Sequence, residues 1–387
     1  MDISTYAIKE TENVISPALI YYKDIILANT KRVIDMAGGA ANLWPHVKSH
    51  KTVGMIHMQI SLGITKFKCA TIAEAEMTAG AADSFDAAHS ANSKPRESQN
   101  GVQIILAYPL VGPNVSRFLN LAAAYPRVTF YAIGDNFDTL SVLSQAANGR
   151  GLNANVLIDV DMGMHRTGVP LDSLLTLYER CASLPGLSLR GMHCYDGHRN
   201  DYDLDKRKEA AKENDLKVLE IKEALKQKGL VCEIMVMGGT PSFPCRLHQD
   251  GFYLSPGTLF LSDWATCSKF PDIAFPPGAA LFTRVVSRQT GNSFTLDLGH
   301  KGIAADPSGD RGVIAGFPNA KALFQSEEHW VFSLPQGEEP PPIGSGVYVI
   351  PTHICPTSAL YPEILVAESG EITDTWQVAA RNRKINF

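Results

Sequence analysis

The chain has 387 residues, of which 45% are hydrophobic and 19% are charged, as in an ordinary globular protein. Its formal net charge of −5 and its lack of a basic cluster argue against nucleic acid as a partner. No apolar run is long enough to span a membrane, and the polar first residues lack a signal-peptide core, so we expect no membrane association. Seven scattered cysteines indicate reduced thiols and a cytoplasmic location.

Short strands and helices alternate along the first two thirds of the chain. The strand patterns cover residues 17–22, 43–47, 67–70, 102–107, 128–133, 156–160, 187–193, 232–237 and 252–254. The helical patterns between them include residues 72–82, 115–124, 138–147, 171–184 and 204–228. Repeated strand–helix units predict a parallel sheet with helical cover, and about eight of them favour a (β/α)8 TIM-type barrel.

The pattern changes beyond Trp264. Residues 282–287 and 294–298 flank a turn and predict a hairpin, and further strand patterns follow with no long helix. We therefore expect an α/β fold with three parts. Residues 1–16 form an N-terminal segment that packs with the β domain, residues 17–267 form the barrel, and residues 268–387 form a C-terminal, mainly β domain. The polar insertion 86–101 and the connector 336–342 are expected to be surface loops.

The first informative motif is WPHVKSHK, residues 44–51. Lys48 closes a predicted barrel strand, and active sites of such barrels lie at the carboxyl ends of the strands. A partly desolvated lysine has a lowered pKa, and its neutral amine can form a Schiff base with an aldehyde. A solvated basic patch is the alternative interpretation.

The second motif is LIDVDMGMHRTGV, residues 157–169, in which a strand is followed by Gly163, Arg166 and Gly168. The guanidinium of Arg166 can donate several hydrogen bonds to an anionic cofactor oxygen. An ordinary capped turn between a strand and a helix explains the same pattern.

The third motif is LRGMHCYDGH, residues 189–198. Strand alternation places His193 and Tyr195 on one inward face, and His198 follows in the loop. A histidine at the barrel mouth is a candidate general base. The alternative is that these histidines are structural.

The fourth motif is a pair of glycine turns, GGTPS at residues 238–242 and SPGT at residues 255–258. Loops after the last two strands of such barrels often bind phosphate through backbone N–H groups, and glycine allows close approach. Each turn alone is a common feature.

The fifth motif is THICPT, residues 352–357, in the expected β domain. His353 and Cys355 are two residues apart on an expected strand end, so both side chains would share a face. Imidazole and thiolate together suit zinc or a similar divalent ion. A buried structural pair is the alternative.

Together these motifs resemble the D-threonine aldolase and D-serine dehydratase-like family of fold-type III, alanine-racemase-type enzymes that use pyridoxal 5′-phosphate (PLP). The resemblance extends from Pro17 to the terminal segment WQVAARNRK. It implies a homodimer in which Lys48 carries PLP. It also implies that PLP is bound by Arg166, Tyr195, Gly239, Thr240, Gly257 and Thr258, and that His353 and Cys355 bind a divalent metal (Mn, Zn or Mg). The family pattern leads us to expect arginine where this chain has Trp44.

The resemblance further implies a lyase that acts on small D-3-hydroxy amino acids. Our leading hypothesis is a metal-activated D-threonine aldolase, with Lys48 and His198 as catalytic residues and His193 as the other candidate base. The alternative is a D-serine or D-3-hydroxyaspartate dehydratase. A racemase, which would tolerate a chelator, and a cofactor-carrying binding protein are further alternatives, although known carriers lack the β domain.

Overall fold

The computed structural model describes residues 2–89 and 101–387. The chain forms two compact units. The β unit comprises Met1–Val33, Ser49–Thr52 and Thr258–Arg381, and the barrel unit comprises Ile34–Lys48, Val53–Gly257 and Asn382–Phe387. The first helix, α1 (Lys23–Met36), begins in the β unit, and its last turn belongs to the barrel unit.

A curved parallel sheet forms the centre of the barrel unit. Its strands follow the order β2-β3-β4-β5-β7-β8-β9, with the short β6 beside β5. Leu43 pairs with Leu254 and His46 pairs with Lys68, both in parallel, so the segment between Leu43 and His46 links the two outer strands. The strands are β2 (Lys66–Cys69), β3 (Gln103–Leu106), β4 (Thr129–Gly134), β5 (Ala154–Asp161), β6 (Val169–Pro170), β7 (Leu187–Cys194), β8 (Ile234–Met237) and β9 (Tyr253–Leu254).

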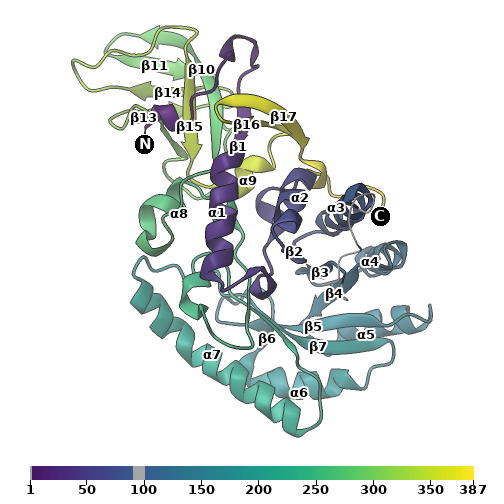
Figure 1. Cartoon of the computed structure of the whole chain (residues 1–387). Helices are drawn as coiled ribbons and strands as arrows, with labels where there is room; N and C mark the ends of the chain where they lie inside the picture. Colours follow the sequence, from purple (N-terminus) through teal and green to yellow (C-terminus); the bar gives the residue numbers. More distant parts are fainter. Residues whose placement is uncertain (1, 90–100) are drawn as a thin grey trace. The chain divides into compact units, whose positions relative to one another are not determined.

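Helices cover the outer face of this sheet (Figure 1). They are α2 (Val53–Ser61), α3 (Ile72–His89), α4 (Pro113–Ala124), α5 (Phe137–Asn148), α6 (Leu171–Ala182) and α7 (Leu204–Gln227). In α6 the buried side chains recur at helical spacing, at Leu174, Leu177, Tyr178 and Cys181. The strands are buried on both faces, as β5 shows, because helices cover one face and the barrel interior fills the other.

Trp44 lies inside the barrel and is fully buried. Its ring makes edge-to-face contacts with Tyr131 and Tyr253, at centroid distances of 5.7 and 5.5 Å. Its Nε1 donates a hydrogen bond to the carbonyl oxygen of Phe67, at 2.7 Å. The indole therefore packs in the barrel core, where it satisfies its one polar atom.

The β unit contains a mixed sheet in the order β13-β14-β11-β10-β1-β16-β17, with β15 beside β10 and β12 beside β15. Buried side chains of several of these strands form its core, among them Ile20, Phe282, Tyr348 and Ile350. The strands are β1 (Ala18–Tyr22), β10 (Ala279–Gln289), β11 (Ser293–Leu296), β12 (Gly312–Ile314), β13 (Lys321–Gln325), β14 (Trp330–Ser333), β15 (Gly346–Pro351), β16 (Glu363–Glu368) and β17 (Glu371–Gln377). The two helices after β9, α8 (Trp264–Lys269) and α9 (Ile354–Ser358), are short.

Three local expectations differ from the structure. The strand expected at residues 43–47 is reduced to isolated parallel bridges at Leu43 and His46, and Val47 begins a 3-10 helix. The strand expected at residues 17–22 forms as β1, but it pairs with β10 and β16 in the β unit and not with the barrel strands (Figure 1). Residues 86–89 of the expected loop belong to α3, which continues to His89, and residues 90–100 lie outside the described residues. The α/β fold with a mainly β part toward the C-terminus is confirmed.

None of the seven cysteines forms a disulfide bond, as the sequence predicts. Within residues 2–89 and 101–387, no helix is both long enough and apolar enough to cross a bilayer.

Candidate active site

Lys48 lies where the chain leaves the segment that links the outer barrel strands. It belongs to a short 3-10 helix, Val47–Ser49, and its backbone N–H donates to His46 Nδ1 at 3.3 Å. The preceding chain is held in place because the N–H of His46 donates to the carbonyl oxygen of Pro256. The half-buried Lys48 side chain places its Nζ 5.9 Å from the centre of the Tyr195 ring.

Three cationic side chains surround the ring of Tyr195. Besides Lys48, the guanidinium carbon of Arg166 lies 5.0 Å from the ring centre, and Lys68 Nζ lies 5.3 Å from it. The structure thus brings together three residues that the sequence singled out, and it adds Lys68, which the sequence analysis missed. The sequence did contain a signal for a buried Lys68, because this lysine stands in a short predicted strand between two apolar residues, Phe67 and Cys69.

Lys68 is 1% exposed. Burial, together with the charge of the nearby Lys48, lowers the pKa of its ammonium to about 7. Asp159 and Asp196 raise this pKa but do not compensate for the loss of solvation. A neutral amine is therefore accessible here near neutral pH.

His193 and Asp159 form a buried pair on neighbouring strands. His193 Nδ1 is 2.7 Å from Asp159 Oδ1. Burial lowers the pKa of His193, although the hydrogen bond to Asp159 opposes this shift. Both His193 Nε2 and Asp159 Oδ2 are buried without a hydrogen-bond partner among the described residues. Buried polar atoms of this kind ordinarily have partners, so they indicate a place for a ligand or water.

The loop after β8 passes close to Tyr195. A Cβ atom added to Gly239 would lie 2.8 Å from Tyr195 Cε2, so this position requires glycine for the backbone to approach the ring. Thr240 Oγ1 accepts a hydrogen bond from the N–H of Gly257 at 3.1 Å, which connects the two glycine turns. Gly239, Thr240 and Gly257 therefore lie together in the barrel unit.

A buried ionic network holds this loop. Ser242 Oγ accepts a hydrogen bond from the N–H of Gly239 at 3.1 Å and donates to Asp196 Oδ1 at 2.5 Å. Arg246 donates to Asp196 Oδ2 at 2.7 Å and to both carboxylate oxygens of Asp215. Arg246 thus pairs with two buried carboxylates, which links the loop after β8 to the loop after β7 and to α7.

His198 lies in the loop after β7, beside Gly163. Its Nε2 is 3.3 Å from where a Cβ of Gly163 would be, and burial lowers its pKa. Its Nδ1 has no hydrogen-bond partner among the described residues. The charges of Asp196 and Asp161 act on His198, whereas those of Lys68 and Arg166 act on His193.

The other predicted site residues belong to the β unit. The expected strand end at His353 and Cys355 is wrong: His353 is the N-cap of α9, and Cys355 lies within that helix because the strand β15 already ends at Pro351. The side chains of His353 and Cys355 are nevertheless within hydrogen-bonding reach of each other. Burial alone would lower the pKa of His353, but its hydrogen bond to Cys355 and the nearby Asp263 raise it to about 9.

Cys355 has two hydroxyl neighbours in the same unit. Its Sγ donates to Ser49 Oγ at 3.0 Å and lies 3.3 Å from Thr258 Oγ1. Ser49 directly follows Lys48 in the chain. Among the described residues, no group of three or more histidine, cysteine, aspartate or glutamate side chains is arranged to hold a metal ion. His353 and Cys355 could supply two protein ligands at most.

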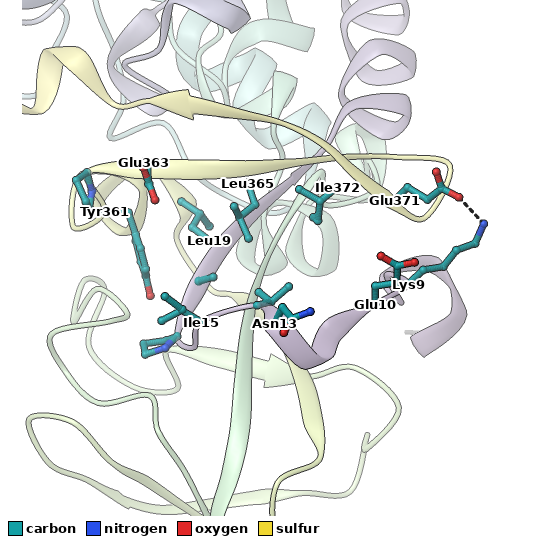
Figure 2. Close-up of a pocket in the computed structure, with 14 residues that line it drawn as sticks. Lys9, Glu10, Asn13, Ile15, Leu19, Tyr361, Glu363, Leu365, Glu371 and Ile372 are labelled. Atoms are coloured by element: carbon teal, nitrogen blue, oxygen red, sulfur yellow. Dashed lines mark hydrogen bonds and ion pairs between the residues drawn. The ribbon is translucent and has the colours of Figure 1, made fainter.

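The β unit also has a cavity of about 640 Å³ that contains none of the predicted site residues. Figure 2 shows Leu19, Leu365 and Ile372 among its lining side chains, with the ion pair of Lys9 and Glu371, 2.7 Å apart, at one side. Nothing in the described residues identifies an occupant of this cavity.

Comparison with known proteins identifies the family. The alanine racemase N-terminal domain model matches residues 23–260, and the putative serine dehydratase domain model matches residues 278–367. The chain belongs to the alanine racemase N-terminal domain family. It is 25% identical to a D-threonine aldolase of an Arthrobacter species, over 90% of this chain and 91% of that protein.

Two further relatives cover nearly the whole chain. A D-threo-3-hydroxyaspartate dehydratase from Delftia sp. (strain HT23) is 22% identical over 94% of this chain and 96% of its own length. The crystal structure of D-threonine aldolase from Filomicrobium marinum superimposes with a TM-score of 0.84 at 25% identity, over 96% of both chains. The predicted resemblance is confirmed. Family membership supports the use of PLP, and the expected enzyme class, a lyase, is confirmed.

Proposed function

We propose that this chain is a metal-activated, PLP-dependent D-threonine aldolase that cleaves D-3-hydroxy amino acids to glycine and an aldehyde. The main support is the cluster of Lys48, Lys68 and Arg166 around Tyr195, beside the Gly239 turn. A lysine amine, an excess of cations and a glycine cradle are the groups that a phosphorylated aldehyde requires. The unpartnered polar atoms of His193 and Asp159 fit a ligand at the same place.

Each residue has a distinct proposed role. Lys48 binds PLP covalently through its amine, and Arg166 and Tyr195 contact the cofactor ring. Gly239, Thr240, Gly257 and Thr258 bind the phosphate through backbone N–H and hydroxyl groups. When bound, PLP supplies an electron sink for the bond that breaks at Cα.

The proton transfer is assigned to a histidine. His198 accepts the proton of the substrate's β-hydroxyl, which allows the Cα–Cβ bond to break. His193 is the other candidate, because its Nε2 is buried and without a partner among the described residues. The pH profiles of kcat for His198→Gln and His193→Gln separate them, since only loss of the true base removes the corresponding limb of the profile.

The metal is proposed to bind at His353 and Cys355. Their side chains are within hydrogen-bonding reach of each other, and an imidazole with a thiolate suits zinc, with manganese and magnesium as further candidates. A divalent ion there would polarise the substrate's hydroxyl group. Binding is testable without activity, because the wild type should retain a stoichiometric metal ion after dialysis and His353→Ala with Cys355→Ala should not.

The second candidate function is dehydration of D-serine or D-3-hydroxyaspartate to a 2-oxo acid and ammonia. It is favoured by the thiol of Cys355, a good zinc ligand, and by the similar coverage of the Delftia dehydratase.

Product analysis decides between the two functions. The purified protein with PLP should convert D-threonine to glycine and acetaldehyde, and a chelator should abolish the reaction until Mn²⁺ or Zn²⁺ is added. Formation of 2-oxobutanoate and ammonia alone would reject the aldolase. Activity that a chelator leaves unchanged would reject the metal-dependent mechanism.

A further inference from the structure

Lys68 is a buried lysine at the carboxyl end of the parallel sheet. It lies on β2, where its backbone N–H donates to the carbonyl oxygen of Pro45 at 2.8 Å. Its side chain is 1% exposed, and its Nζ lies 5.3 Å from the centre of the Tyr195 ring. The amine therefore points into the same space as the amine of Lys48.

No carboxylate is bonded to this amine. Among the described residues, Lys68 Nζ has no hydrogen-bond acceptor and no ion pair. The oxygens of Asp196 are engaged by Ser242 and Arg246, and Asp159 Oδ1 is engaged by His193. Burying an ammonium without a partner is costly, so such a group is ordinarily paired when the site is filled.

The positive charges around Tyr195 also indicate that Lys68 is paired when the site is filled. Lys48, Lys68 and Arg166 are cationic groups within 6 Å of one ring centre, at 5.9, 5.3 and 5.0 Å. Cations that converge in a partly desolvated space repel one another unless an anion binds among them. A negative oxygen in the filled site would add to the charges of Asp159 and Asp196, which already oppose this repulsion at Lys68.

We propose that Lys68 is an anion-binding positioning residue of this site and that it pairs with a negatively charged oxygen of the bound molecule. This inference rests on the proposed function, which supplies two sources of such an oxygen: the cofactor and the carboxylate of the amino-acid substrate. In either case Lys68 fixes the orientation of the molecule attached at Lys48 and reduces the repulsion among the three cations.

The test removes the charge at Lys68 and uses Lys66 as the matched control. Lys66 lies two residues earlier on the same strand and therefore on the same face, but its Nζ donates to the carbonyl oxygen of Ala41 and lies over Tyr253. The variants are Lys68→Met, Lys68→Gln, Lys68→Arg and Lys66→Met, with circular dichroism as the check of folding. Two affinities are measured: PLP for the apoprotein by equilibrium dialysis, and D-threonine for the holoprotein by its effect on the visible spectrum.

We expect Lys68→Met and Lys68→Gln to weaken one of the two affinities by about tenfold or more, equivalent to about 1.4 kcal/mol. Lys68→Arg should restore most of the loss, and Lys66→Met should change neither affinity by more than about twofold. A loss confined to PLP assigns the oxygen to the cofactor, and a loss confined to D-threonine assigns it to the substrate.

If folded Lys68→Met and Lys68→Gln bind PLP and D-threonine as tightly as the wild type does, this inference is wrong. Lys68 then serves only to balance the charge of Asp159. They leave the proposed function intact as long as the wild type binds PLP. A wild-type protein that does not bind PLP overturns both.

Discussion

His193 Nδ1 donates to Asp159 Oδ1 across adjacent strands β7 and β5, over a distance of 2.7 Å, with both side chains buried. This bond places the proton on Nδ1 and leaves Nε2 as an acceptor, because burial keeps the ring neutral by lowering its pKa. The imidazole thus presents one defined lone pair near the cations around Tyr195.

Asp159→Asn should reverse that arrangement. The asparagine amide can donate to Nδ1, which moves the ring proton to Nε2 and removes the acceptor. We expect kcat to fall by about tenfold or more, as for other carboxylates that orient a functional histidine, while the protein stays folded. Asp161→Asn is the control, because Asp161 pairs with His165 in the same way but His165 is exposed. Equal losses in the two variants would show that the His193 tautomer is unimportant.

Arg246→Met should destabilise the barrel unit. The substitution leaves Asp196 and Asp215 buried without their cation, and breaking a buried ion pair in this way costs about 3–5 kcal/mol. Urea unfolding measures the change. Arg190→Met removes the exposed ion pair with Glu233 and should cost less than about 1 kcal/mol. A loss below about 1 kcal/mol for Arg246→Met would mean that the network does not stabilise the fold.

Much of the barrel is predictable from its sequence because local hydrophobic patterns determine where its strands and helices form. Alternating short apolar runs and amphipathic helices locate β2 to β9 within a few residues, except the two-residue β6, and glycine turns after β8 and β9 locate the proposed phosphate loops. The place of β1 is not predictable in this way. The residues of β1 favour a strand, but the sequence does not show which strands they pair with. Tertiary packing decides that they pair with β10 and β16, more than 250 residues later.

The candidate site is predictable only in part, for a similar reason. Lys48, Arg166 and Tyr195 stand in motifs whose spacing marks the carboxyl ends of strands. Lys68 stands in a four-residue strand with one lysine on either side of Phe67, and its sequence does not show which face is buried. The helix at Cys355 was also missed, since five residues are too few to establish a helical period.

Gly239→Ala should weaken PLP binding. The new methyl group would lie 2.8 Å from Tyr195 Cε2, so either the ring or the loop must move. We expect the PLP dissociation constant of the apoprotein to rise by about tenfold, a loss of about 1.4 kcal/mol. Gly80→Ala is the control, because its Cβ would meet only Tyr125 Oη at 3.6 Å and alanine favours the helix α3. Unchanged PLP affinity in Gly239→Ala would remove this turn from the cofactor site.

His50 should make the protein less stable in mild acid. It is 1% exposed, its Nε2 has no partner among the described residues, and burial lowers its pKa to about 3, with Lys51 acting in the same direction. As pH falls below about 6.5, the unfolded chain therefore binds a proton that folded His50 does not, and the free energy of unfolding falls by up to about 1.4 kcal/mol per pH unit. Between about pH 7 and pH 5 this contribution amounts to about 2 kcal/mol. His50→Asn keeps an acceptor for the N–H of Thr52 and should flatten the slope measured by urea unfolding, whereas substituting the exposed His329 by glutamine should not. If His50→Asn and the wild type lose stability in parallel over this range, His50 is not the group that titrates.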